Sequence, residues 1–249
     1  MDALYDGLFG MRSTVRPTPA ELAVEGVDSA LASLVPELDT REIPRKQRRF
    51  MSPMSLFATL AGVDALRQAR LEDDRDAIAL ALGSTTGSTA ANEEFFRSFL
   101  PARDTAELKS THFFRIMNHS CAGNVAGALG LTGRILAPAS ACATATQALG
   151  LAYELIAAGR ERICLCGGAE EYHGLATAVF DVMGTATRKW NDRPTATPRP
   201  FDRDRDGIVC GEGAGLLVLE AASSARARGV PVLGEVIGFA TSGGGVGLA

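Results

Sequence analysis

The residue best suited to covalent chemistry in this sequence is Cys142. It follows Ser140 and Ala141, where a short apolar run is expected to turn into a helix. A cysteine at a helix N-terminus lies near unpaired backbone N–H groups and the positive end of the helix dipole, which stabilise a thiolate. A thiolate there can attack a thioester carbonyl, and the cysteine's own N–H can hold the oxyanion. The alternative is a small buried side chain, the common state of a free cysteine.

The other cysteines predict no disulfide framework. The chain has five cysteines and no Cys-x-x-Cys spacing, which indicates free thiols in a reducing compartment, so we expect a cytoplasmic protein. Cys164 and Cys166 alternate within an apolar run and are expected to pack in the core.

The histidines do not form a metal-binding pattern. His119 and Cys121 are two residues apart, so on a helix they would not share a face. His112 and His173 have no spacing typical of ligands. We therefore expect structural histidines and no metal site.

A glycine-rich stretch at Gly211–Gly215 does not match a nucleotide-binding motif. It is Gly-x-Gly-x-Gly between two apolar runs, whereas the dinucleotide fingerprint joins a strand to a helix. No Gly-Lys-Ser/Thr phosphate loop is present either. A dinucleotide-binding enzyme is therefore a remote alternative.

The elements that must position Cys142 are alternating helices and short buried strands, which predict an α/β protein with a mostly buried mixed sheet. Helices are expected to begin at Thr18 and Ser52 and to cover 113–129, 143–158 and 221–228. Strands are expected at 77–82, 135–137, 162–166, 207–210, 214–220 and 232–239, with 207–210 and 214–220 paired around a glycine turn. Residues 189–206 are polar and are expected to form a long loop.

Composition limits the partners. With 249 residues, 46% of them hydrophobic, the chain can bury a sizeable core. The net charge of −4 gives no argument for nucleic acid, and no apolar run is long enough for a membrane span. Residues 41–49 are locally basic; they are either a solvated loop or a docking patch for an acidic partner.

Five stretches in register resemble the β-ketoacyl-acyl-carrier-protein synthases, condensing enzymes of the thiolase-like superfamily. The stretch around Cys142, Ser-Ala-Cys-Ala-Thr, resembles the family's nucleophile motif. The others are 166–170 (CGGAE), 180–184 (FDVMG) with 190–192 (WND), 200–202 (PFD) with 205–207 (RDG), and 211–215 (GEGAG) leading into LLVLE. Together they span most of the chain from about residue 40 to residue 240.

The resemblance implies a thiolase-like α/β fold and a decarboxylating condensation. Cys142 would accept an acyl group, and a malonyl-carrier thioester would then lose carbon dioxide and attack it. The family uses no metal or organic cofactor, works with acyl carrier protein, and is usually dimeric. Thr86, Phe180 and Met183 match positions that line the acyl pocket in the family, although each is equally well explained as plain core.

The sequence departs from the family in extent. We expect residues 1–249 to form one N-terminal-like domain, without the family's C-terminal half and its usual first strand. That half carries two histidines, a lysine and a glycine-rich loop, so residues 1–249 alone are not expected to condense. We expect a homodimer, or a heterodimer with a chain that supplies the missing half.

Two other functions remain open at this point. A non-catalytic scaffold similar to the family's chain-length factors would use the fold for dimerisation or carrier binding, but such partners usually lack the cysteine. A thiolase or another thioester-handling relative is disfavoured, because the loop and glycine motifs look more like the carrier-dependent synthases.

Overall fold

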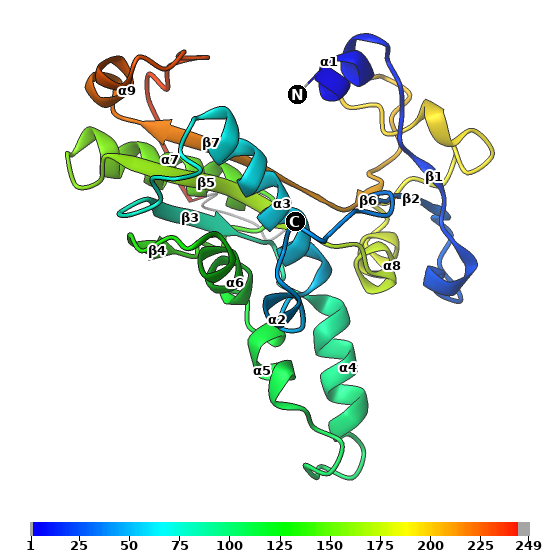
Figure 1. Cartoon of the computed structure of the whole chain (residues 1–249). Coiled ribbons are helices and arrows are strands. Elements are labelled where there is room, and N and C mark those ends of the chain that lie inside the picture. Colours follow the sequence, from blue (N-terminus) through cyan, green and yellow to red (C-terminus); the bar gives the residue numbers. More distant parts are fainter. Residues whose placement is uncertain (1, 244–249) are drawn as a thin grey trace. The chain divides into compact units, whose positions relative to one another are not determined.

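The structure is a computed structural model that describes residues 2–243 (Figure 1). The chain forms two compact units. The larger unit consists of Asp39–Glu170 and Ala214–Ala249, and the smaller unit consists of Met1–Leu38 and Glu171–Gly213.

The larger unit is built on a four-stranded sheet in the order β4-β3-β5-β7. These strands are β4 (Ile135–Leu136), β3 (Ala79–Gly83), β5 (Ile163–Glu170) and β7 (Gly213–Glu220). β3 runs parallel to both neighbours, with Leu80 opposite Ile135 and Leu165. The strands predicted near 77–82, 135–137, 162–166 and 214–220 are confirmed, and β5 continues through its glycines to Glu170.

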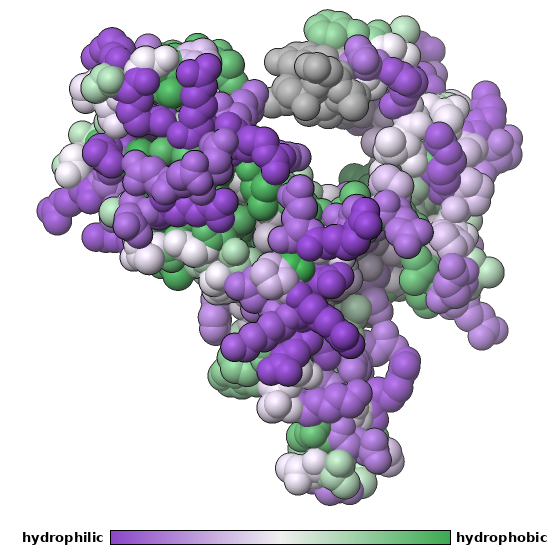
Figure 2. All heavy atoms as spheres, viewed as in Figure 1, coloured by the Kyte–Doolittle hydropathy of each residue, from purple (hydrophilic) through white to green (hydrophobic). Residues whose placement is uncertain are grey.

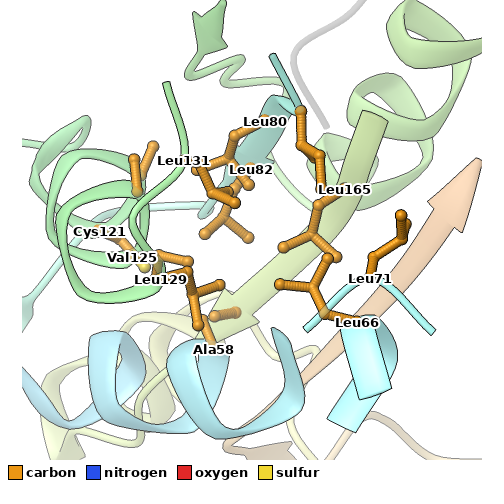
Figure 3. Close-up of a cluster of buried hydrophobic side chains, with 14 of the residues drawn as sticks. Ala58, Leu66, Leu71, Leu80, Leu82, Cys121, Val125, Leu129, Leu131 and Leu165 are labelled. Atoms are coloured by element: carbon orange, nitrogen blue, oxygen red, sulfur yellow. The ribbon is translucent and has the colours of Figure 1, made fainter. Parts of the chain in front are cut away.

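Alternate residues of β3 face two different helix layers. Leu80 and Leu82 join a core of large side chains with α3 (Pro53–Gln68) and α6 (Ser120–Leu129), as Figure 3 shows. Ala79 and Ala81 face α7 (Thr144–Ala157), and the side chains that meet there are small. Because small residues let helix and sheet approach closely, α7 is held tightly against β3 and β5.

Further helices of the larger unit are α2 (Arg45–Arg48), α4 (Thr89–Phe99), α5 (Ser110–Ile116) and α9 (Ala222–Arg228). The single helix predicted over 113–129 is wrong, because the chain breaks between α5 and α6. Met117 has an extended backbone at this break, and the side-chain oxygen of Asn118 lies over Gly87, 2.7 Å from where a Cβ would be. The helices predicted from Ser52, over 143–158 and over 221–228 are confirmed.

The smaller unit contains α1 (Asp2–Phe9), β1 (Arg16–Pro17), β2 (Leu31–Ser33), α8 (Gly174–Val182) and β6 (Cys210–Gly211). Its strands form a sheet in the order β1-β2-β6. Two short 3₁₀ turns lie at Ala20–Leu22 and Pro194–Ala196, the second within the predicted long loop.

The helix predicted from Thr18 is wrong. Only the 3₁₀ turn at Ala20–Leu22 forms, and Leu31 and Ala32 are instead buried in β2. The Thr18 N–H donates to the Ala30 carbonyl over 2.8 Å, next to the β1–β2 pairing. Sheet pairing therefore overrides the local capping motif.

The predicted pairing of 207–210 with 214–220 is also wrong. β6 is short and lies parallel to β2, with Cys210 opposite Ala32, whereas β7 belongs to the sheet of the larger unit. Gly213 between them has a φ of +153°, a conformation that favours glycine. The glycines thus mark a passage between sheets.

The strand predicted at 232–239 does not form in the described part of the chain. Val232, Leu233 and Ile237 are 62%, 76% and 90% exposed, and no strand pairs with this segment within residues 2–243. A strand needs a neighbour for its backbone groups, so sequence pattern alone was not sufficient. None of the described helices is long and apolar enough to cross a membrane.

Candidate active site

Cys142 lies immediately before α7, as predicted, and its side chain is exposed. Ala141, the residue before it, has a φ of +46°. A non-glycine residue in this left-handed region costs on the order of 1–3 kcal/mol and persists only where its surroundings fix it. The nucleophile candidate therefore sits on a strained turn at the N-terminus of a 14-residue helix.

Thr144 fixes this turn from the helix side. Its hydroxyl accepts from the Ser140 N–H over 2.8 Å and donates to the Ala141 carbonyl over 2.7 Å. The Thr144 N–H donates to the same carbonyl over 3.0 Å, and the Ala143 N–H donates to Ser140 over 3.0 Å. None of these bonds uses the N–H of Cys142, which can therefore serve as an oxyanion donor.

Two glycines let the turn and the helix approach the sheet. A Cβ on Gly83, at the end of β3, would overlap the Pro138 carbonyl oxygen and the Thr144 methyl group. A Cβ on Gly168, in β5, would lie 2.8 Å from the Ala145 Cβ. Gly83 at the end of β3 and Gly168 within β5 are therefore required by the positions of the turn and of α7.

A hydrogen-bond network joins the ends of β3 and β5 beside this turn. Glu170 accepts from the Thr85 N–H with one carboxylate oxygen and from the Ser84 hydroxyl, over 3.1 Å, with the other. The Ser84 hydroxyl accepts in turn from the Gly87 N–H over 2.9 Å. The Thr85 hydroxyl donates to the Ala141 carbonyl over 3.3 Å.

Sequence reasoning missed this network. The signal was present, because Ser84, Thr85 and Glu170 stand at the carboxyl ends of two apolar runs. Carboxyl ends of neighbouring parallel strands meet at one edge of a sheet, which is the usual place for a site in such folds. What the sequence did not supply was that β3 and β5 are neighbours.

The core role predicted for Cys164 and Cys166 is confirmed. Both are fully buried between the sheet and α7, and burial raises the pKa of each thiol to about 12. Cys121 is buried as well, and burial raises the pKa of the half-buried Cys210 thiol. The exposed Cys142 is thus the cysteine whose environment permits chemistry.

The structure gives each of the three histidines a setting of its own. His112 is buried with its Nε2 3.3 Å from Glu94, and its Nδ1 lies 3.4 Å from the Lys109 N–H, which donates to it. His119 precedes α6, and His173 caps α8 by accepting from the Leu175 N–H over 3.2 Å. Within residues 2–243, no group of three His, Cys, Asp or Glu side chains is placed to hold a metal ion.

The predicted pocket residues are divided between the two units. Thr86 follows β3 in the larger unit and is exposed. Phe180 and Met183 lie at the end of α8 in the smaller unit, where Phe180 is half-buried and Met183 is exposed. A pocket formed by all three stays a prediction.

Loop motifs of the smaller unit bind its own backbone. Asp206 accepts from the Thr187 hydroxyl over 2.7 Å and from the Arg188 and Lys189 N–H groups over 2.8 and 2.7 Å. Burial alone would raise the pKa of Asp206. These hydrogen bonds and the charge of Lys189 lower it by more, so the pKa of Asp206 lies below its usual value. Asn191 bonds to the backbone of 28–30.

The basic segment, residues 41–49, contains α2 and is attached to the larger unit. Gln47 donates to the Gly127 carbonyl of α6 over 3.1 Å, and Arg48 donates to the Thr40 hydroxyl over 3.0 Å. Its exposed cations are Arg41, Arg45, Lys46 and Arg49. Figure 2 shows hydrophilic side chains gathered around α2.

In this arrangement β4, β3 and β5 run parallel, and an exposed cysteine precedes the helix that covers β3 and β5, as expected for a thiolase-like fold. The sequence model of the β-ketoacyl synthase N-terminal domain matches residues 17–225. The chain therefore belongs to the β-ketoacyl synthase family, and the predicted resemblance and fold class are confirmed.

Individual relatives agree with this assignment. The chain is 31% identical to 3-oxoacyl-[acyl-carrier-protein] synthase 1 of Haemophilus influenzae over 209 residues, which are 82% of this chain and 52% of that protein. A β-ketoacyl synthase crystal structure from Burkholderia phymatum STM815 superposes with a TM-score of 0.86, at 38% identity, over 92% of this chain and 57% of that one. The ishigamide ketosynthase/chain length factor superposes with a TM-score of 0.79, at 29% identity, over 93% and 57%.

These matches cover only part of each relative. The chain spans about half the length of the curated relatives it matches. The activity, substrates and partners of the whole proteins are therefore matters of proposal for this chain.

Proposed function

We propose that this chain is the acyl-accepting part of a 3-oxoacyl-carrier-protein synthase of fatty-acid or polyketide-type biosynthesis, with Cys142 as the acylated residue. The observation that carries the proposal is the exposed Cys142 on a strained turn at the N-terminus of α7. Membership of the β-ketoacyl synthase family supports the same reading.

The first step is acyl transfer to sulfur. The Cys142 thiolate attacks the carbonyl carbon of an acyl-carrier thioester, and the Cys142 N–H stabilises the oxyanion. Collapse of this intermediate breaks the bond to the carrier's sulfur, which leaves as a thiolate and takes up a proton. The proton released by the Cys142 thiol balances that uptake.

The second step is decarboxylative carbon–carbon bond formation. A malonyl-carrier thioester loses carbon dioxide, and the electron pair of the broken bond forms an enolate that attacks the acyl-Cys142 carbonyl. The Cys142 thiolate then leaves and is regenerated. Enolate stabilisation needs further donors, and we assign it to the histidine-bearing second half that the resemblance implies.

The proposal gives the other predicted residues roles. Thr86, Phe180 and Met183 line the acyl chain's path, with the unbranched Met183 adapting to chain shape. The chemistry uses the cysteine thiolate as nucleophile, so we assign no cofactor. Cys142 must remain a thiol, which places the reaction in a reducing compartment such as the cytoplasm.

We assign carrier docking to the basic segment. Four exposed cations lie within nine residues there. One of them, Arg41, is paired with Asp39, and Glu42 adds a negative charge. An acidic carrier protein would be steered toward such a patch by long-range attraction, which raises the association rate and weakens with salt.

Reversing two of these charges tests the proposal. We expect Arg45→Glu with Lys46→Glu to slow acyl transfer from acyl-carrier protein to the chain by roughly tenfold at low salt, because the change acts on association. Transfer from acyl-coenzyme A should change little. Rates are measured by intact mass at several salt concentrations.

The matched control is Arg226→Glu, an exposed cation on α9 outside the basic segment. It should leave both transfer rates near those of the unchanged chain. Equal slowing by the control and the double variant, or none by either, would contradict docking at α2.

A second candidate function is a non-catalytic scaffold. The similarity to the ishigamide ketosynthase/chain length factor supports this candidate. The presence of Cys142 and the network that surrounds its turn argue against it. A folded chain that never forms an acyl adduct would support the scaffold function over acyl transfer.

A further inference from the structure

The turn that carries Cys142 is held from two sides, and only one of them is local. The Ala141 carbonyl accepts three donors: the N–H and hydroxyl of Thr144, and the hydroxyl of Thr85. Thr144 is part of α7 itself, so its bonds follow from the helix start. Thr85 comes from the loop after β3 and reaches the turn across the end of the sheet.

The position of Thr85 is in turn set by Glu170. One carboxylate oxygen binds the Thr85 N–H and the other binds the hydroxyl of Ser84, a buried residue that also receives the Gly87 N–H. Glu170 thus cross-links the carboxyl ends of β3 and β5. A carboxylate that accepts backbone and hydroxyl donors makes stronger bonds than a neutral acceptor does.

From this geometry we infer that Glu170 and Thr85 are positioning residues for the nucleophile turn, which they hold through the Ala141 carbonyl so that the Cys142 N–H and Sγ are aligned for acyl transfer. The inference rests on the proposed role of Cys142. It adds two residues, one from the end of β5 and one from the loop after β3, to which the sequence analysis gave no role.

The physical reason is the strained backbone at Ala141. A residue at a φ of +46° stays there only where several contacts determine it together. Removing the Thr85 hydroxyl leaves the two Thr144 bonds, so the turn still forms but has more freedom. Acyl transfer depends on where the N–H points, and small misplacements of a reacting group lower such rates by up to roughly 100-fold.

Two reactions of the same sulfur separate positioning from folding. Transfer from octanoyl-coenzyme A passes through an oxyanion that the backbone N–H must meet. Alkylation by iodoacetamide displaces iodide from carbon, forms no oxyanion and needs only an accessible thiolate. We expect Thr85→Val and Glu170→Gln to slow acyl transfer roughly tenfold while alkylation stays within about twofold.

The variants have matched controls. Thr85→Ser keeps the hydroxyl and should restore acyl transfer. Thr132→Val removes a threonine hydroxyl at the other end of β3, where it accepts the Ala77 N–H over 3.1 Å. That change should lower the melting temperature without altering the ratio of the two rates. An unchanged ratio in both Thr85→Val and Glu170→Gln would overturn the inference.

Amide hydrogen exchange of a peptide covering residues 139–145 makes the test independent of acyl transfer. Faster exchange in Thr85→Val and Glu170→Gln, but not in Thr132→Val, is the expected result. If the unchanged chain accepts no acyl group and exchange still rises in the two variants, positioning stands and the proposed function falls. If acylation proceeds and neither exchange nor the rate ratio changes, the function stands and positioning falls.

Discussion

Gly83→Ala is expected to lower the free energy of unfolding by about 3 kcal/mol, because overpacking against fixed groups is costly. The added methyl group would overlap the Pro138 carbonyl oxygen, which is backbone, and the methyl group of Thr144. Neither neighbour is the far end of a flexible side chain. Relief would require the turn before Cys142 to move away from the sheet, so we expect the site to be disrupted along with stability.

The measurement for Gly83→Ala is chemical denaturation followed by circular dichroism. The control is Gly123→Ala in α6, where nothing lies within 4 Å of an added Cβ. There the change should stabilise the helix by up to about 1 kcal/mol, the usual gain in a helix interior. If Gly83→Ala does not lower the free energy of unfolding below that of the Gly123→Ala control, the turn does not pack closely against β3.

Alkylation at pH 8 is expected to modify Cys142 and leave the other four cysteines unreacted in the folded chain. The Cys164 and Cys166 thiols have a pKa of about 12, so their thiolate fraction at this pH is about one in ten thousand, and the thiolate is the reacting form. They and Cys121 are also buried, which excludes the reagent, and burial raises the pKa of the half-buried Cys210 thiol. Labelling at these positions should wait for unfolding.

Intact mass after iodoacetamide treatment measures this selectivity. One adduct is expected in the folded chain, and all five cysteines should react in denaturing urea. Cys142→Ser should lower the rate of the first adduct by at least about 100-fold. A second adduct at a comparable rate in the folded chain would contradict the protection expected for the other four thiols.

The parts of the fold that the sequence predicted well are those set by local pattern. The short apolar run at 77–82, ending in a glycine turn, was correctly predicted as a buried strand, and the Ser-Pro start with the apolar spacing after it correctly predicted α3. The place of Cys142 followed from a strand-like run, a turn and a helix in succession. These features depend on neighbours in the chain.

The parts that failed depend on partners distant in the chain. Thr18 begins a good helix motif, yet Leu31 and Ala32 gain more from burial beside β6 than a helix would give them. Residues 113–129 are apolar enough for one helix, but near the middle of this segment the side chain of Asn118 packs against Gly87. Residues 232–239 have strand composition and no strand beside them in the described structure.

The candidate site shows the same division. Cys142 was found because its own neighbours define its setting. Thr85 and Glu170 were not, because their roles depend on β3 lying beside β5 and on the turn lying across both strand ends. No spacing in the sequence states either contact.

The central claim, that Cys142 accepts an acyl group, is tested most directly by intact mass. The purified chain is incubated with an acyl-carrier thioester, in parallel with Cys142→Ala. An increment equal to one acyl group that is absent from the alanine variant is the predicted result. A folded chain that takes up no acyl group, or an increment that persists in Cys142→Ala, would contradict it.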